Sequence, residues 1–173
     1  MVTKNWYYVM KAYRAQNTLT GVITDTSGNK FNSSYYASDT ILLTMTLRAN
    51  AGLSFYYASS NSNSYIVLGR GRTPATVNDY KLENMITSGL SATVSNSVDE
   101  NGDCTQKLVI TNTSSGDITI REIGLSAPFY RSTSSSDRGM ALMDRTVLDE
   151  PVTIPAGGIG MIDYTIKIPI PTA

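Results

Sequence analysis

Short hydrophobic runs alternate with polar positions over most of the chain, and residues that favour turns separate the runs. The segment 162–168 is the clearest, because its even positions are apolar or aromatic and its odd positions are polar. The segment 41–49 is similar, with Ile41, Leu43, Met45 and Leu47 on one face and Thr44, Thr46 and Arg48 on the other. A period of two is that of an antiparallel strand with one face in the core. Both segments are therefore predicted strands.

β-branched and aromatic residues in similar patterns predict the remaining strands. These cover residues 6–13, 18–23, 65–69, 90–98, 104–112, 118–125, 140–148 and 152–154. Segments 90–98 and 104–112 form a predicted hairpin around the turn 99–103. The apolar parity changes between Ile120 and Ile123, which indicates either a β-bulge near Arg121-Glu122 or burial of both faces. The polar segment 126–139, with Phe129 and Tyr130 at its root, is a predicted loop.

A helical signal appears in residues 76–86, where Thr76 suits a helix cap, Asp79 the first turn, and Leu82 and Met85 one apolar side. We expect at most one short helix there. The turn-punctuated strands predict a single all-β domain over residues 1–173, an antiparallel β-sandwich or jelly-roll-like fold. Residues 1–16 are expected to form an N-terminal arm or an edge strand used in assembly.

Composition narrows the classes of partner. Lys+Arg and Asp+Glu are balanced at 14 each, so we expect no nucleic-acid partner and no membrane partner. Only 16% of residues are charged, and serine and threonine supply much of the polarity, as in extracellular or particle-forming β proteins. No apolar run approaches the ~20 residues of a membrane span, and residues 1–16 lack the apolar core of a signal peptide. We therefore expect synthesis and assembly in a cytoplasm.

The absence of histidine removes Ser-His-Asp and Cys-His catalysis and most catalytic zinc sites. Paired carboxylates remain a route to glycoside hydrolysis, but Asp99 and Asp103 lie in a predicted turn, and Asp149-Glu150 precedes a proline. Cys104 is the single cysteine, so it forms no intrachain disulfide. It is read either as a small strand residue or as a reactive thiol. We predict a non-enzymatic protein that needs no cofactor.

Two short motifs carry alternative interpretations. Asp99, Asn101 and Asp103 match the opening of a calcium loop, but Cys104 occupies the glycine position and Ile110 the position of the closing glutamate. A weak cation site and a plain hairpin turn both remain open. The Gly69-Arg70-Gly71-Arg72 stretch is either an anion-contacting loop or a turn with solvated or subunit-facing arginines.

Tyrosines stand among serine and asparagine in several places, a mixture that gives binding surfaces a large contact area at low entropic cost. The alternative is that these rings fill the core. In an adjacent pair on a strand, one ring points inward and the other outward. The interface candidates are Trp6, Tyr7, Tyr36, Tyr56, Tyr57, Arg70, Arg72 and Tyr130.

The order of several short segments along the chain is also informative. They are residues 5–8 (NWYY), 68–71 (LGRG), 73–74 (TP), 79–82 (DYKL), 110–113 (ITNT), 121–125 (REIGL), 144–148 (DRTVL), 151–158 (PVTIPAGG) and 164–166 (YTI). In this order they resemble small β-rich structural proteins of tailed bacteriophages, especially those from gut-type bacterial hosts. The resemblance covers most of the chain beyond Tyr65. The usual form has Gly-Thr-Gly where this chain has Gly69-Arg70-Gly71, so no role of that loop is carried over.

The resemblance implies a non-enzymatic virion protein and supplies no catalytic residues. We expect a capsid decoration or auxiliary protein, assembled in the bacterial host cytoplasm and located in the virion. It would bind other virion structural proteins through β-edges and tyrosine-rich loops, as a homo-oligomer with a trimer favoured. The alternatives are a tail, collar or fibre subunit and, from another class, a carbohydrate-binding β-sandwich that uses exposed tyrosines as stacking platforms. We expect residues 104–168 to form the scaffold and the N-terminal half, with the loop 126–139, to make the specific contacts.

Overall fold

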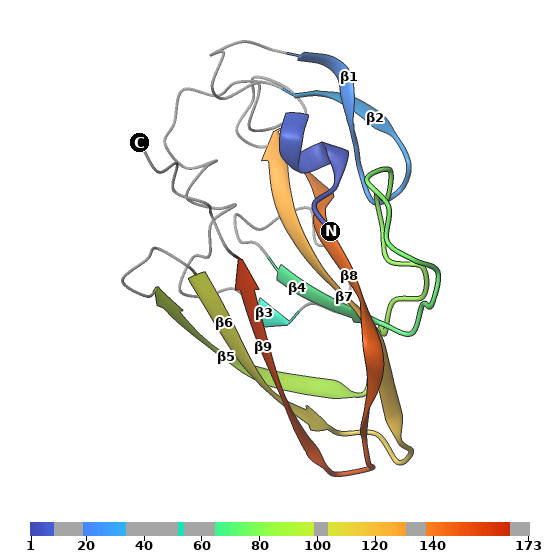
Figure 1. Ribbon diagram of the computed structural model, residues 1–173, viewed down its shortest axis with the longest axis vertical. Helices are drawn as coiled ribbons and strands as arrows, with labels where there is room; N and C mark the ends of the chain where they lie inside the picture. The colour runs from blue at the N-terminus through green and yellow to red at the C-terminus, as the bar shows by residue number, and fades with distance from the viewer. Residues whose placement is uncertain (9–18, 34–51, 54–64, 99–103, 131–137, 167–173) are drawn as a thin grey trace.

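The computed structural model describes residues 1–8, 19–33, 52–53, 65–98, 104–130 and 138–166, and these residues are predominantly β (Figure 1). The strands in these residues are β1 (Leu19–Thr24), β2 (Lys30–Ser33), β3 (Gly52–Leu53), β4 (Tyr65–Gly69), β5 (Leu90–Val98), β6 (Cys104–Asn112), β7 (Ile118–Tyr130), β8 (Arg138–Ile154) and β9 (Ile159–Ile166). One helical turn covers residues 4–8. The predicted all-β class is confirmed.

Two sheets face one another, and a separate hairpin stands beside them. The larger sheet has the order β3-β4-β7-β8, the smaller has the order β5-β6-β9, and β1 pairs with β2. All of these neighbours are antiparallel except the β3–β4 pair, which is parallel. This arrangement is sandwich-like, as the turn-punctuated strand pattern predicts.

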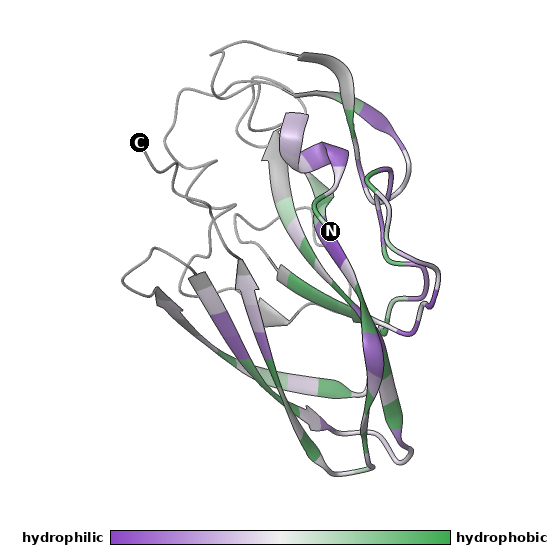
Figure 2. Ribbon diagram, viewed as in Figure 1, coloured by the Kyte–Doolittle hydropathy of each residue, from purple (hydrophilic) through white to green (hydrophobic). Residues whose placement is uncertain are grey.

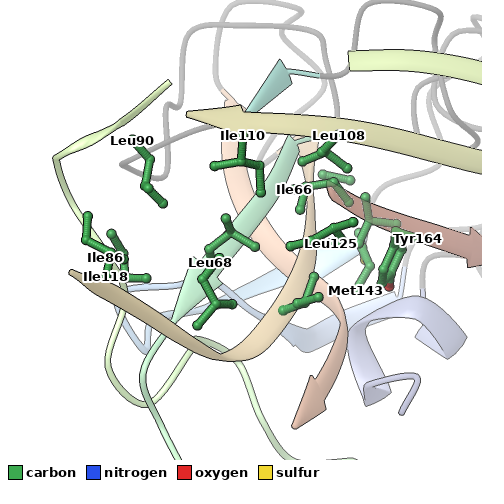
Figure 3. Packing of buried hydrophobic residues seen from close by; sticks show 14 of the residues in the cluster. Ile66, Leu68, Ile86, Leu90, Leu108, Ile110, Ile118, Leu125, Met143 and Tyr164 are labelled. Carbon is green, nitrogen blue, oxygen red and sulfur yellow. The ribbon is translucent and has the colours of Figure 1, made fainter. Parts of the chain in front are cut away.

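Apolar side chains from both sheets fill the space between them (Figure 3). Ile66 and Leu68 of β4 and Leu125 of β7 belong to the same buried cluster as Leu108 and Ile110 of β6. Complete burial of such a side chain contributes roughly 1.5–3 kcal/mol. The core between the sheets is therefore the main apolar contribution to the stability of the sandwich.

Part of the outer face of the larger sheet is buried as well, beneath the loop formed by residues 70–86. Val67 points away from the inter-sheet core and packs with Leu82 of the loop and Leu142 of β8. The three central residues of β4, Ile66, Val67 and Leu68, are accordingly all apolar, and the strand is green over this part in Figure 2. A Cβ at Gly124 would lie 2.8 Å from Leu142 Cδ1 and 2.9 Å from Leu82 Cδ2, so a larger residue here would displace these two leucine side chains.

Several strand predictions are confirmed in detail. β4, β5 and β6 begin and end where the alternation predicts. The β7–β8 register shifts between Ile120 and Glu122, which is the predicted bulge, and the apolar residues on both sides of it are buried. In β9, Ile162 and Tyr164 are buried and Asp163 is exposed.

The predicted loop 126–139 is wrong at both ends. β7 continues to Tyr130 and β8 begins at Arg138, because Ser126 and Ala127 are buried in register with Leu142 and Ala141. The predicted strands 140–148 and 152–154 are parts of the single strand β8. Pro151 does not interrupt β8, since it lies in the register shift where residues 148–151 have no partner in β7, on a strand at the edge of its sheet.

The short helix is not where the sequence indicates. Residues 76–86 form turns and bends, in which Thr76 and Asp79 bond each other, and Met85 bridges to Gly69. The helical turn lies at 4–8, so the predicted strand 6–13 is wrong for its first three residues, and 9–13 lie outside the described residues. Tertiary contacts favour the helical turn at 4–8, since the Asn5 side chain forms hydrogen bonds with the backbone of Thr24 and Leu142.

The N-terminal residues before that turn pair with the edge of β8 in the same chain, and the use of residues 1–16 in assembly stays a prediction. Val2 bridges to Asp144, and the Thr3 amide donates to the Met143 carbonyl at 2.9 Å. The predicted strand 41–49 and the turn 99–103 lie outside the described residues.

Candidate functional site

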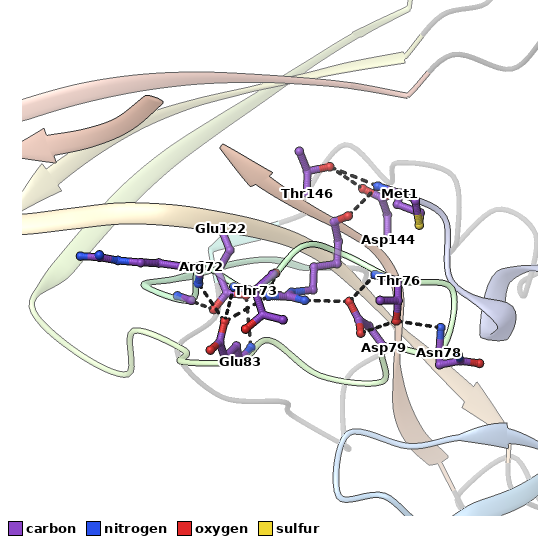
Figure 4. A network of polar contacts seen from close by, with 12 residues as sticks. Met1, Arg72, Thr73, Thr76, Asn78, Asp79, Glu83, Glu122, Asp144 and Thr146 are labelled. Atoms are coloured by element: carbon purple, nitrogen blue, oxygen red, sulfur yellow. Dashed lines mark hydrogen bonds and ion pairs between the residues drawn. The ribbon is translucent and has the colours of Figure 1, made fainter. Parts of the chain in front are cut away.

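A network of charged side chains fixes the loop 70–86 to the outer face of the larger sheet, with Glu122 of β7 at its centre (Figure 4). The Glu122 side chain is fully buried. Its Oε1 accepts hydrogen bonds from the amides of Gly71 and Asn84, each at 2.9 Å. Its Oε2 accepts from the amide of Glu83 at 3.2 Å and from Arg145 Nε at 2.8 Å. Four donors therefore surround this carboxylate.

Two glycines allow the loop to reach that carboxylate. A Cβ at Gly71 would lie 2.6 Å from Glu122 Oε1 and from Glu83 Cβ, and a Cβ at Gly69 would also meet Glu122. The absence of a side chain at these positions lets the backbone approach the carboxylate directly. Arg70 and Arg72, which alternate with the glycines, are exposed.

Arg145 of β8 joins the network from the next strand. Its Nη1 donates to Asp79 Oδ2 at 2.7 Å, and its Nη2 donates to the Thr73 carbonyl at 3.1 Å. Glu83 Oε2 lies 3.6 Å from Nη2 and also accepts from the amides of Arg72 and Thr73, each at 2.8 Å. One guanidinium thus binds three carboxylates and a carbonyl that belong to distant parts of the chain.

The ionised forms of these groups stabilise one another. Burial acts to raise the pKa of Asp79, but hydrogen bonds from Thr76 and Arg145 outweigh it and leave this pKa below its usual value. Hydrogen bonds from Thr73 and Arg72 lower the pKa of Glu83. Burial acts to lower the pKa of Arg145, whereas its bonds to Asp79 and Glu122 raise it, with a net increase. Asp79, Glu83 and Arg145 are therefore charged at neutral pH.

This arrangement anchors a loop and presents no free reactive group. Both oxygens of the buried Glu122 carboxylate are occupied by internal donors, so they are closed to a substrate. The amides of Gly71, Arg72 and Thr73, which an anion-binding loop would offer to a ligand, already bind Glu122 and Glu83. Among the cationic side chains of this loop, those of Arg70, Arg72 and Lys81 are exposed and could meet an external anion or a neighbouring subunit.

A second polar link crosses the sandwich. Tyr164 of β9 donates a short hydrogen bond from its hydroxyl to Asp144 Oδ2 of β8. Burial, followed by the charge of Asp144, raises the pKa of Tyr164 far above its usual value. This phenol stays protonated and connects the two sheets as a donor.

Beside the network, two open hollows share a wall made of Asn78, Asp79 and Tyr80. The larger, of about 290 Å³, lies between that wall, the helical turn and the β1–β2 hairpin. The smaller, of about 240 Å³, is lined by the network itself, including Arg145 and Glu83. Neither lies between the two sheets.

The outer face of the smaller sheet carries an unusual patch. Ile159 and Met161 of β9 are 68% and 71% exposed, and Met161 is paired with Val109 of β6, which is 38% exposed. We call Val109, Ile159 and Met161 the β9 patch. Beside it, Lys107 and Asp163 form a loose ion pair at 3.9 Å, with both side chains more than half exposed. The neighbouring strand β5 presents only serine and threonine at its exposed positions on this face.

The structure places the predicted interface residues as follows. Trp6 is half-buried and packs against the core, whereas Tyr7, Arg70 and Arg72 are exposed. Tyr36, Tyr56 and Tyr57, the side chain of Tyr130, and the cation candidates Asp99, Asn101 and Asp103 lie outside the described residues. Trp6 and Tyr7 lie on the helical turn, far in sequence from the loop that carries Arg70 and Arg72.

Sequence reasoning did not find the Glu122–Arg145 network or the β9 patch. A signal for the network was present, since each of these two charged residues lies inside a strand. The β9 patch is hidden by Gly160, which separates Ile159 and Met161 and weakens the alternation at the start of β9.

Comparisons of the chain with protein-family models, with curated proteins and with solved structures found no match. Within the described residues, no group of three or more His, Cys, Asp or Glu side chains is arranged to hold a metal ion. No helix in the described part of the chain is long and apolar enough to cross a membrane.

Proposed function

We propose that this chain is a non-enzymatic structural protein of a bacteriophage virion, a capsid decoration protein that associates with copies of itself and with neighbouring virion subunits. The observation that supports association is the β9 patch. A single exposed apolar side chain is ordinary on a protein surface, whereas adjacent ones on a strand surface mark contact sites. The ordered phage-like segments support the choice of a virion.

The charged side chains beside the β9 patch favour a second copy of this chain as the protein that binds there. Lys107 and Asp163 lie directly opposite one another on β6 and β9, and their pairing within one chain is loose. A copy related by a two-fold axis through the patch would place each lysine near the aspartate of its partner. The equal numbers of acidic and basic residues leave no net charge to separate the copies. A contact of this kind is self-complementary.

The energy of association would come from the apolar side chains. Removal of apolar surface from water contributes roughly 25 cal/mol per Å² before the costs of association. The contact around three side chains is small, so a symmetric shell that repeats it would add avidity. The trimer expected from the sequence would instead require a head-to-tail contact, and the measured stoichiometry distinguishes the two.

Analytical ultracentrifugation of the purified chain tests the self-association. We expect the double variant Ile159→Lys/Met161→Lys to remain monomeric at concentrations where the unmodified chain associates. Ser97→Lys, an exposed position on β5 of the same sheet, is the matched control and should associate normally. A chain that is monomeric at all concentrations, or a double variant that associates as well as the control, contradicts the proposal.

The virion location is tested separately, on particles purified from the bacterial culture that produces the chain. Mass spectrometry should detect the chain in these particles, and gold-labelled antibody should mark the shell. Label confined to the tail, collar or fibres would favour the alternative virion role. Absence of the chain from purified particles would contradict both.

A further inference from the structure

The larger hollow beside the charged network brings together three segments that are distant in sequence. Its walls come from the helical turn at 4–8, the β1–β2 hairpin and the loop residues 77–80, which lie on the same side of the molecule (Figure 1). The lining residues that matter here are Lys4, Tyr8, Lys30, Asn78, Asp79 and Tyr80. None of them belongs to the β9 patch.

Hydrogen bonds hold these walls in place. The Lys4 amide donates to the Val77 carbonyl at 2.8 Å, and the Asn5 side chain bonds both the amide and the carbonyl of Thr24. Gly28, in the turn of the hairpin, faces the Tyr80 ring, since a Cβ added at this glycine would lie 3.6 Å from the ring. A ligand would therefore enter a hollow whose segments are already joined, which lowers the cost of ordering on binding.

The charges of the lining favour an anion. Lys4 and Lys30 are exposed and have no ion-pair partner among the residues that the structure describes. Asp79 is the carboxylate in this lining, and Arg145 binds it at 2.7 Å from the other side of the wall. The two ammonium groups are thus the charges left to interact with a ligand. The nearby Asp79 disfavours a doubly charged group such as phosphate more than a singly charged carboxylate.

The other groups favour a sugar ring. Tyr8 and Tyr80 are half-buried, so each presents part of an aromatic ring, and the exposed Asn78 side chain supplies an amide. Partly exposed rings with a few polar groups are typical of small-molecule sites, and amphipathic rings such as tyrosine suit ligands with both polar and apolar faces. At about 290 Å³ the hollow is at the lower end of the size of ligand sites, so it fits one monosaccharide.

We propose that this hollow binds a sugar that carries a carboxylate, such as a uronic or sialic acid. The carboxylate lies between Lys4 and Lys30, and the ring lies against the tyrosines and Asn78. This binding is non-covalent and independent of the β9 patch, so it adds a recognition site to the proposed structural role.

Isothermal titration calorimetry with four separate probes tests the proposal: glucuronic acid, N-acetylneuraminic acid, glucose and inorganic phosphate. At least one of the two acids should bind about tenfold more tightly than glucose and phosphate, because a carboxylate adds charge-assisted hydrogen bonds. The double variant Lys4→Gln/Lys30→Gln should weaken this binding about tenfold. Lys107→Gln, on the distant β6 face, should leave it unchanged. Circular dichroism of each variant checks that the fold is retained.

Several outcomes would overturn the proposal. They are no binding of either acid, equal binding of glucose, binding of phosphate as strong as that of the acids, or an equal effect of Lys107→Gln. Binding of phosphate with the same dependence on Lys4 and Lys30 would identify a general anion site instead. A failure of sugar binding would leave the self-association proposal standing, because calorimetry measures binding in the hollow and ultracentrifugation measures association through the β9 patch.

Discussion

The two faces of the larger sheet are buried by different means. On its inner face, apolar side chains of β4 and β7 pack against the smaller sheet. On its outer face, a small apolar group around Val67 is covered by a loop that Glu122 and Arg145 hold through charged hydrogen bonds. Apolar packing loses stability in proportion to the atoms removed, whereas a buried charge that loses one partner is left uncompensated. The outer face should therefore be the less tolerant of substitution.

The largest expected effect is that of Glu122→Gln. An amide in place of one carboxylate oxygen sets a donor against the donors of Arg145 and Glu83 and removes the buried negative charge. We expect a loss of about 3–5 kcal/mol in the free energy of unfolding, measured by urea denaturation. Hydrogen exchange should accelerate at the amides of Gly71 and Asn84, which bond this carboxylate. Unchanged exchange at these two amides would show that the loop is held by its apolar contacts.

Leu108→Ala tests the inner face. Leu108 is fully buried in β6, so the substitution removes apolar contacts and leaves a cavity, at a cost of about 2–4 kcal/mol in urea denaturation. The hydrogen-exchange rates of the Gly71 and Asn84 amides should then increase only as much as the lower free energy of global unfolding requires. A selective acceleration at these amides would contradict the separation of the two faces.

Gln106→Met is expected to stabilise the chain. Gln106 is fully buried on the inner side of β6, and neither atom of its amide group has a hydrogen-bond partner among the residues that the structure describes. Since an unpaired buried polar group costs about 1–3 kcal/mol, a methionine of similar shape should raise the free energy of unfolding by about 1 kcal/mol. A calorimetric melting temperature equal to or below that of the unmodified chain would mean that the amide is satisfied in solution.

The smallest expected effect is a dependence on acid. The pKa values of Asp79 and Glu83 are lowered by folding, so their ionised forms contribute stability above the unfolded values of 3.8 and 4.5. That contribution decreases as the pH falls below about 4 and through the folded values. Urea denaturation at pH 7 and pH 3 should show a smaller loss for Asp79→Asn than for the unmodified chain. Equal losses would assign the acid sensitivity to other carboxylates.

Local patterns in the sequence predicted the elements that depend on neighbouring residues, but not those that depend on distant contacts. β4, β5 and β6 were predictable because alternation and flanking turns are local, and the bulge before Glu122 left a change of parity. The end of β7 was not predictable, because Ser126 is buried through pairing with a distant strand despite its polar side chain. Likewise, the helical turn at 4–8 depends on bonds from Asn5 to Thr24 and Leu142.

The candidate sites were less predictable than the strands. Glu122 and Arg145 were visible as charges within strands, but their partners Asp79 and Glu83 lie far away in sequence. The hollow likewise depends on three segments whose proximity no local pattern encodes. Exposure of Tyr7, Arg70 and Arg72 agrees with their choice as interface candidates, and whether they make contacts stays a prediction.

The two glycines at 69 and 71 have a consequence for the ancestry of this chain. Their lack of side chains is required by Glu122, whereas the residue between them is exposed and makes no demand on the fold. Folding should therefore tolerate substitution at Arg70, while the glycines, the glutamate and its arginine are inherited together. Distant relatives should then share a Gly-x-Gly motif, in which x is any residue. A glutamate and an arginine on adjacent strands should follow it far along the chain.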